Sequence, residues 1–372
     1  MRFSQVAGHA PLKAKLIMNL REGRVPHAQF FLGPRGSGNL PLAIAYARYL
    51  LCADPGPADP CGACASCGQM EKLAHPDMHF AFPLFLNEKS RTCAPLLPAW
   101  RDLVLKEPYL DAALWRDHLE GENKQLRMGV DVAAEITRQL SLKAYAGGWR
   151  VMLVWLPELM DAAAANKLLK VLEEPEPRTV FLLVGHEADR ILPTILSRTQ
   201  LVKVPALAED DIVRALRGKF EDLAEADAHA AAVRSAGDLL EATQSVEKGE
   251  EELFVLFRDW LRACYALKVQ DTVEFAEHFA KMGRERQKGL MRYGLYLVRL
   301  SMLMSQRAFQ LVRTTGEELK FVTDISRLLG ADNVSGMREE LEMAHVHLER
   351  NANAKVLFMD LSYRLHGLLK QR

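Results

Sequence analysis

A glycine-rich turn between two apolar stretches limits the folds open to this chain more than any other feature. The stretch AQFFL, residues 28–32, is mostly apolar and predicts a short buried strand. The turn GPRGSG, residues 33–38, follows it, and the stretch LPLAIAYARYLL, residues 40–51, has the apolar spacing of a helix. A strand, a glycine loop and a helix in this order are typical of the phosphate-binding loop with the pattern G-x-x-x-x-G-K-[ST].

The turn lacks the two residues that act on a nucleotide in that pattern. A lysine there reaches the β- and γ-phosphates and a hydroxyl holds Mg²⁺, whereas this chain has Asn39 and Leu40. P-loop NTPases also need an acid at the end of a neighbouring strand, but no Asp-Glu pair follows the apolar run at 151–154. Loss of the whole set argues against ATP hydrolysis. We expect no ATP binding at the remaining loop residues, which are Gly33, Gly36, Gly38 and Asn39.

Strand-like and helix-like stretches alternate over residues 1–205. The runs WRVMLVWL, residues 149–156, and RTVFLLVG, residues 178–185, are continuously apolar, as buried parallel strands are. Between them Asp161 can cap a helix that ends before Pro175. This alternation predicts an α/β layer with a parallel sheet.

Helical patterns replace the strand signals after residue 205. We expect a small helical domain at 206–248, a charged linker at 247–252 and an all-helical domain at 249–372, where apolar residues recur at helical spacing. Residues ~80–125 do not fit the alternation, and we interpret them as an insertion in the α/β domain. Its aromatic residues form either a local core, which we favour, or a docking surface; they are Phe80, Phe82, Phe85, Trp100 and Trp115.

Four of the six cysteines lie close together in the sequence. Cys52, Cys61, Cys64 and Cys67 have the spacing C-x8-C-x2-C-x2-C, and the C-x2-C steps let neighbouring thiolates converge on one ion. This pattern predicts a structural zinc site between residues 52 and 67, since four protein ligands leave no open position. Four unrelated thiols are the alternative. We expect a turn or capping role for His75, and ordinary thiols at Cys93 and Cys264.

The charge balance limits the nucleic-acid contacts that the chain can make alone. Lys and Arg total 48 and Asp and Glu total 48, so the formal net charge is zero. A protein that binds DNA by neutralising phosphates is usually basic, so we expect any such contact to be local or shared with partners. The beginning of the chain has no signal-peptide core, and no apolar run approaches the ~20 residues that span a bilayer. We therefore expect a cytoplasmic protein without a membrane segment.

Several quoted stretches, in this order, resemble bacterial DNA polymerase III clamp-loader subunits. They are GRVPHAQFFLGPRGSG, the four-cysteine insertion, RMGVDVAAEI, AAAANKLLKVLEEP and ILPTILSRTQ, and they cover almost all of residues 1–205. The later stretch HLERNANAKVLFMDLSYRL resembles the last helices of those subunits. The resemblance implies an α/β plus all-α architecture: an AAA+ P-loop-type sheet domain with a zinc module, a small helical lid, and a helical collar that joins other subunits.

The departures from the family's ATPase motors, the gamma/tau subunits, favour its nucleotide-silent member. The motors carry a loop lysine, a threonine, strand-end acids and a polar sensor, where this chain has Asn39, Leu40, Trp155, Leu156 and Gly185. The resemblance then implies a non-catalytic subunit of the DNA polymerase III complex. It would assemble with gamma/tau and delta subunits and support loading of the sliding clamp onto primer–template DNA.

One residue of the family's catalytic set is present. Ser197-Arg198-Thr199 matches the family's Ser-Arg-Cys motif, with Thr199 in place of the cysteine. The resemblance implies that Arg198 acts as an arginine finger in the ATP site of a neighbouring motor. A surface arginine that caps a helix end is the alternative for this residue.

Other interpretations compete with the silent subunit. In the first, the glycine turn is an ordinary turn that never bound a nucleotide, but the strand before it and the helix after it disfavour this interpretation. An active AAA+ clamp-loader ATPase would need Asn39 to replace a lysine without its charge. A zinc-dependent nucleic-acid-binding module would need a basic face near the cysteines, but the segment 52–72 is acidic to neutral.

Overall fold

The computed structural model describes residues 1–86, 91–121, 124–142, 144–145, 148–248, 251–312, 314, 316–328, 331–350 and 352–370. The chain forms two compact units. The first contains residues 1–228 and 235–243, and the second contains residues 229–234 and 244–372. Residues 249–250 of the expected linker lie outside the described residues. The domain limits inferred from the sequence remain predictions.

A five-stranded parallel sheet forms the centre of the first unit, in the order β2-β3-β4-β1-β5. The strands are β1 (Ala28–Leu32), β2 (Met78–Ala81), β3 (Arg150–Trp155), β4 (Thr179–Gly185) and β5 (Gln200–Lys203). The predicted parallel α/β layer is confirmed, and β1, β3 and β4 lie where the apolar runs place them. The sequence analysis missed β5, because only Val202 of this edge strand is buried. It also missed β2, which includes two residues of the expected insertion.

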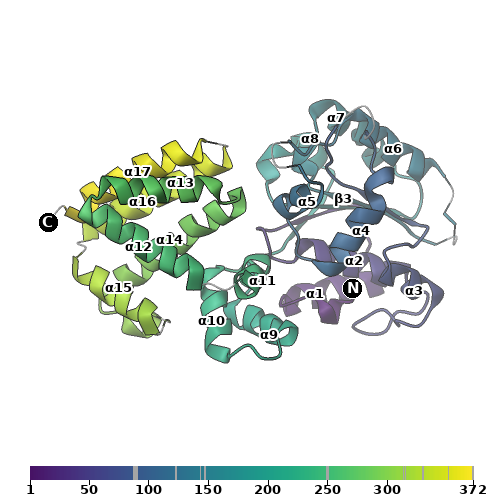
Figure 1. Cartoon of the computed structure of the whole chain (residues 1–372). Coiled ribbons are helices and arrows are strands. Elements are labelled where there is room, and N and C mark those ends of the chain that lie inside the picture. Colours follow the sequence, from purple (N-terminus) through teal and green to yellow (C-terminus); the bar gives the residue numbers. More distant parts are fainter. Residues whose placement is uncertain are drawn as a thin grey trace. The chain divides into compact units, whose positions relative to one another are not determined.

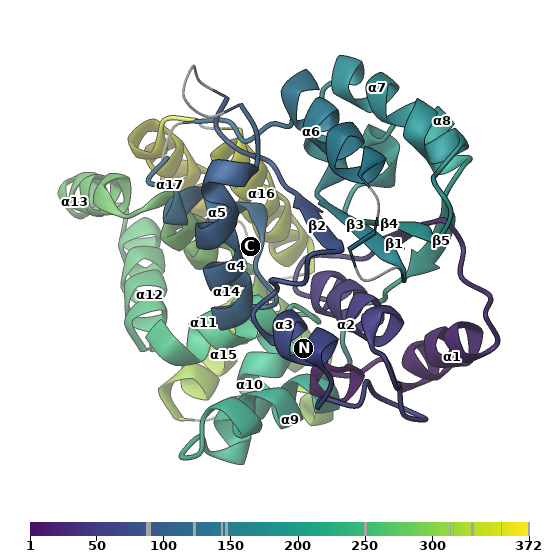
Figure 2. The same ribbon diagram turned by 90° about the vertical axis from the view of Figure 1, so that its right-hand side faces the viewer.

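Helices cover both faces of the sheet (Figures 1 and 2). On one face α2 contacts β1, β3 and β4, and on the other α6 contacts β2 and β3 and packs against α7. Asp161 caps α7 as predicted, since its Oδ1 accepts the Ala164 N–H at 2.7 Å. The helices before residue 205 are α1 (Ala10–Arg21), α2 (Asn39–Leu51), α3 (Ala65–Glu71), α4 (Leu97–Lys106), α5 (Ala112–His118), α6 (Val130–Ser141), α7 (Ala162–Glu173) and α8 (Pro193–Leu196).

The aromatic residues of the expected insertion pack against one another. The rings of Phe82 and Trp100 stack with centroids 5.0 Å apart, and Trp115 meets Phe82 edge-on at 5.5 Å. The Trp115 indole N–H donates to the Pro83 carbonyl at 2.7 Å. Phe80, Phe82, Trp100 and Trp115 are buried, and Phe85 is half-buried. These residues are therefore core rather than a docking surface, and they belong to the same hydrophobic core as the sheet.

The rest of the described chain is helical, as predicted. The helices are α9 (Glu209–Lys219), α10 (Glu225–Arg234), α11 (Leu239–Lys248), α12 (Glu251–Ala266), α13 (Val269–Lys281), α14 (Arg284–Ser305), α15 (Gly316–Leu328), α16 (Ala331–Glu349) and α17 (Ala354–Lys370). In the second unit Trp260 stacks on Phe358 at 4.3 Å and donates to Ser362 Oγ at 2.9 Å. Within the described ranges no helix is long and apolar enough to cross a membrane.

Candidate functional site

The glycine loop at residues 33–38 joins β1 to α2 in the manner of a phosphate-binding loop. Gly36 and Gly38 have φ values of 64° and 91°, which L side chains rarely adopt. A Cβ on Gly33 would overlap the backbone carbonyl of Val204. The glycines of the loop are therefore required by the local fold, whether or not a phosphate binds.

Asn39 occupies the lysine position and its amide bonds to neighbouring backbone groups. Its Nδ2 donates to the Gly185 carbonyl at 3.0 Å, and its Oδ1 accepts the Leu40 N–H at 2.9 Å. The residue is only 5% exposed. Asn39 thus links the start of α2 to the end of β4. Its side-chain oxygen also accepts a hydrogen bond from the Leu40 N–H, one of the backbone N–H groups at the start of α2.

The strand ends beside the loop bring together a carboxylate and an imidazole. Glu158 is buried, which raises the pKa of its carboxyl group, and its Oε1 accepts the His186 N–H at 2.8 Å. The His186 Nδ1 lies 2.8 Å from the Gly33 carbonyl, so this nitrogen carries the proton. A Cβ on Gly185 would overlap Glu158. Glu158 therefore faces the backbone of β4, and a side chain at position 185 would require the Glu158 carboxylate to move.

Arg35 is the cation within the loop, and two carboxylates already neutralise it. Its Nη1 lies 2.9 Å from Asp111 Oδ2, and its Nε donates to Asp238 Oδ2 at 2.8 Å. The carboxylate of Asp238 also lies against Gly36, where a Cβ would overlap it. Sequence reasoning missed both acids, because they lie far from Arg35 along the chain.

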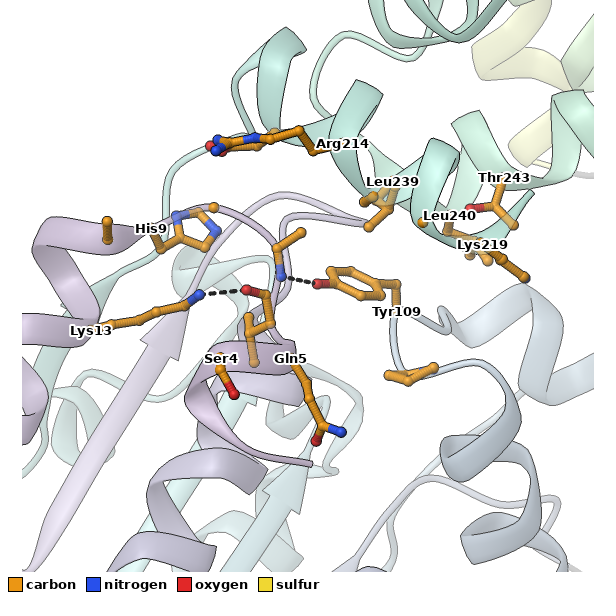
Figure 3. Close-up of a pocket in the computed structure, with 18 of the residues that line it drawn as sticks. Ser4, Gln5, His9, Lys13, Tyr109, Arg214, Lys219, Leu239, Leu240 and Thr243 are labelled. Carbon is orange, nitrogen blue, oxygen red and sulfur yellow. Dashed lines mark hydrogen bonds and ion pairs between the residues drawn. The ribbon is translucent and has the colours of Figure 1, made fainter. Parts of the chain in front are cut away.

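A cavity of about 760 Å³ lies beside the loop within the first unit (Figure 3). The N-terminal segment, residues 106–109, α9 and the start of α11 line it. The described cations around it already have partners. These contacts are Lys13 with the Val6 carbonyl, Lys106 with Asp102, Arg214 with Asp211 and Lys219 with Glu107. Burial lowers the pKa of Lys13.

Together these contacts do not fit ATP with its Mg²⁺. The lysine position holds a neutral amide that is already bonded. The end of β3 carries Trp155 and Leu156 in place of metal-binding acids. The one loop cation is paired twice.

The four predicted cysteines converge, and their sulfur atoms lie within 4.8 Å of one another. The Cys52 sulfur is 3.5 Å from Cys61, 3.6 Å from Cys67 and 4.0 Å from Cys64. A tetrahedral zinc ion with Zn–S bonds of about 2.3 Å separates its sulfur atoms by about 3.8 Å. Donors from Ala63 and Cys64 lower the pKa of Cys61 to about 6, which favours a thiolate. The cluster therefore fits a closed metal site.

A buried arginine that the sequence analysis missed supports this cluster. The Arg48 side chain on α2 is 2% exposed, and its Nη2 donates to the Cys67 carbonyl at 3.2 Å and to Glu71 at 2.9 Å. Zinc with four thiolates carries a net charge of about −2, so a buried cation beside it is favourable. A lone arginine in an otherwise apolar helix was the available signal. His75 lies outside the cluster, and its ring accepts the Asp77 N–H in a turn as predicted.

Arg198 lies at the end of α8. Its described contacts involve neither the glycine loop nor the cysteine cluster. Its Nη1 donates to the Thr194 carbonyl at 2.9 Å, and its Nη2 pairs with Glu173 at 2.6 Å. The side chain is 35% exposed and that of Glu173 is 46% exposed. Within this chain Arg198 caps a helix end, and its guanidinium remains accessible.

The sequence matches the family described as DNA polymerase III, delta subunit, over residues 8–208. It is 33% identical over 187 residues to the DNA polymerase III subunit delta′ of Escherichia coli K12, a match covering 50% of this chain and 45% of that protein. It is 32% identical over 197 residues to the subunit gamma/tau of Mycobacterium bovis, which covers 53% of this chain and 27% of that protein. The chain thus spans about half, or less, of these relatives' length.

One solved structure, a DNA polymerase III gamma subunit-related protein of Thermotoga maritima, aligns with 96% of this chain and 100% of its own. The TM-score is 0.43 and the sequence identity 15%. This likeness is too distant to carry an argument.

Metal analysis tests the cysteine cluster directly. We expect about one zinc ion per chain after purification without chelators, and almost none in Cys61→Ser, which removes one of four ligands. Cys264→Ser is the control, since Cys264 lies outside the cluster and should leave the zinc content unchanged. Near-zero zinc in the unaltered protein would contradict the assignment.

Removal of the Arg48 charge should weaken metal binding without removing a ligand. We expect Arg48→Met to lower zinc affinity roughly 10- to 100-fold, the range for residues that support metal ligands. Competition with a coloured chelator measures this, and Arg48→Lys should recover part of the loss because it keeps the charge. Equal affinities in all three proteins would show that Arg48 serves only packing.

Proposed function

Because the chain belongs to the DNA polymerase III delta subunit family, we propose that it is a delta′-type subunit of a clamp loader. In this role it supports the placing of a sliding clamp on primed DNA and does not itself hydrolyse ATP. The family match covers more than half of the chain, and the curated relatives carry the names subunit delta′ and subunit gamma/tau. The wider DNA polymerase III complex would supply the polymerase activity.

The contact of Asn39 with Gly185 is the observation that carries the silent role. A P-loop lysine supplies a charge to the β- and γ-phosphates, whereas Asn39 is neutral and is turned to the end of β4. An active ATPase would also need an acid to hold Mg²⁺, and Glu158, the acid that follows β3, is directed at backbone groups. These features support a structural subunit over a motor.

We place Arg198 in the ATP site of a neighbouring motor subunit. A guanidinium beside a γ-phosphate stabilises the charge of the transition state and contributes ~10³–10⁵ in rate. Its present partner, Glu173, is about half-exposed. Ion pairs of this kind contribute only ~0–1 kcal/mol, so exchange of Glu173 for a phosphate costs little. The accessibility of Arg198 supports this role.

The second unit would provide the collar that joins this chain to gamma/tau and delta subunits. Its α17 exposes Val356 and Tyr363, two residues seven positions apart and therefore on the same helix face. Exposed apolar groups at this spacing suit a helix–helix contact with a partner. Contacts with the clamp and with primer–template DNA would come through the assembled complex. The cysteine cluster would hold zinc in a structural role.

The arginine proposal is tested in a loader reconstituted with gamma/tau and delta subunits. We expect Arg198→Ala to assemble normally and to lower the clamp- and DNA-stimulated ATPase rate. At the one site that Arg198 completes, the loss should approach the ~10³-fold lower limit for such residues. The measurement is steady-state ATP hydrolysis, with assembly confirmed by gel filtration.

Two further variants separate this role from a structural one. Arg190→Ala removes another exposed arginine paired with a glutamate, Glu187, and should leave the rate unchanged. Glu173→Gln frees Arg198 and should also preserve the rate. Full activity of Arg198→Ala in an assembled loader would reduce Arg198 to a helix cap.

A further inference from the structure

The segment of residues 107–111 crosses from α4 to α5 and contacts the surroundings of the glycine loop on three sides; we call it the strap. Glu107 pairs with Lys219 of α9 at 3.1 Å. The Tyr109 hydroxyl accepts the Ala7 N–H at 2.7 Å, a contact that Figure 3 shows reaching the N-terminal segment. Asp111 pairs with Arg35 of the loop at 2.9 Å. The strap therefore joins the loop, the N-terminal segment and α9.

The two carboxylates on Arg35 are held in place by helix starts. Asp111 Oδ1 accepts the Leu114 N–H at 2.8 Å at the start of α5, which leaves Oδ2 for Arg35. Asp238 is bound in the same way, with Oδ1 on the Glu241 N–H at 3.0 Å and Oδ2 on Arg35. Both carboxylate side chains are largely buried. An incoming phosphate would have to displace preorganised anions from the loop cation.

Tyr109 covers the end of the loop where the helix begins. A Cβ on Gly38 would lie 3.0 Å from its ring, so the ring is in contact with the loop backbone. Burial raises the pKa of Tyr109 to about 12, and the hydroxyl remains neutral at physiological pH. The side chain therefore occupies the space above Gly38 as an uncharged aromatic group.

We propose that the strap is a built-in closure of the glycine loop, which gives a function to part of the insertion. Asp111, with Asp238, supplies the negative charge that Arg35 would otherwise find in a phosphate, and Tyr109 covers Gly38. This inference rests on the proposed silent role and names the groups that keep nucleotides out. It also distinguishes two reasons why this chain would not bind a nucleotide. One is the missing lysine, and the other is the closure, which acts independently of it.

Binding of a fluorescent ADP analogue with Mg²⁺ tests the closure in four full-length proteins. They are the unaltered chain, Asn39→Lys, the double variant Tyr109→Ala/Asp111→Ala, and the combination of all three changes. We expect no detectable binding by the unaltered chain and only weak binding by Asn39→Lys. The combination should bind at least about tenfold more tightly than Asn39→Lys. If Asn39→Lys alone binds as tightly as the combination, or a folded combination gains nothing, the closure is wrong.

The same series distinguishes failure of the closure from failure of the proposed function. Tight binding by the unaltered chain would contradict the silent role itself. Hydrogen exchange gives a second measurement that does not depend on the combined variant folding. Asp111→Asn should speed amide exchange across residues 33–40 and 238–241, whereas Asp102→Asn, an exposed acid of the same insertion, should not. Equal exchange in both variants would overturn the proposal.

Discussion

The ion pairs of Arg35 with Asp111 and Asp238 are the interaction on which the candidate site depends. One guanidinium in the glycine loop joins the start of α5 to the start of α11. These groups are partly buried, so the attraction between them is screened less than that of surface charges. A loop that binds phosphate in other proteins here binds carboxylates of its own chain. The same contacts also hold the start of α11 against the glycine loop.

Helix α2 connects this loop to the cysteine cluster. Asn39 begins the helix and bonds to the end of β4, while Cys52 follows its last residue and contributes to the cluster. Arg48 lies between them and donates to Cys67. Nearly every residue of α2 is buried. The helix is therefore a rigid element that positions the glycine loop at one end and Cys52 at the other. A zinc ion would therefore stabilise the same helix that positions the glycine loop.

The sequence predicted the features that depend on local pattern. The apolar runs of β3 and β4 and the cysteine spacing are readable because neighbouring residues carry the signal. The contacts of Arg35 were not predictable, since Asp238 lies 203 positions away and nothing local marks it as a partner. The edge strand β5 was missed because a single inward residue makes no apolar run. The finger role of Arg198 came from the resemblance alone, and its contacts within this chain leave that role a prediction.

Equilibrium binding of ATP with Mg²⁺ to the purified, unaltered chain tests the central claim most directly. Isothermal titration calorimetry should detect no saturable binding up to about 1 mM ATP, because the lysine position is neutral and the loop cation is already paired. A dissociation constant of about 10 μM or lower would contradict the account. It would show that the glycine loop still receives a nucleotide, and that this chain belongs with the motors.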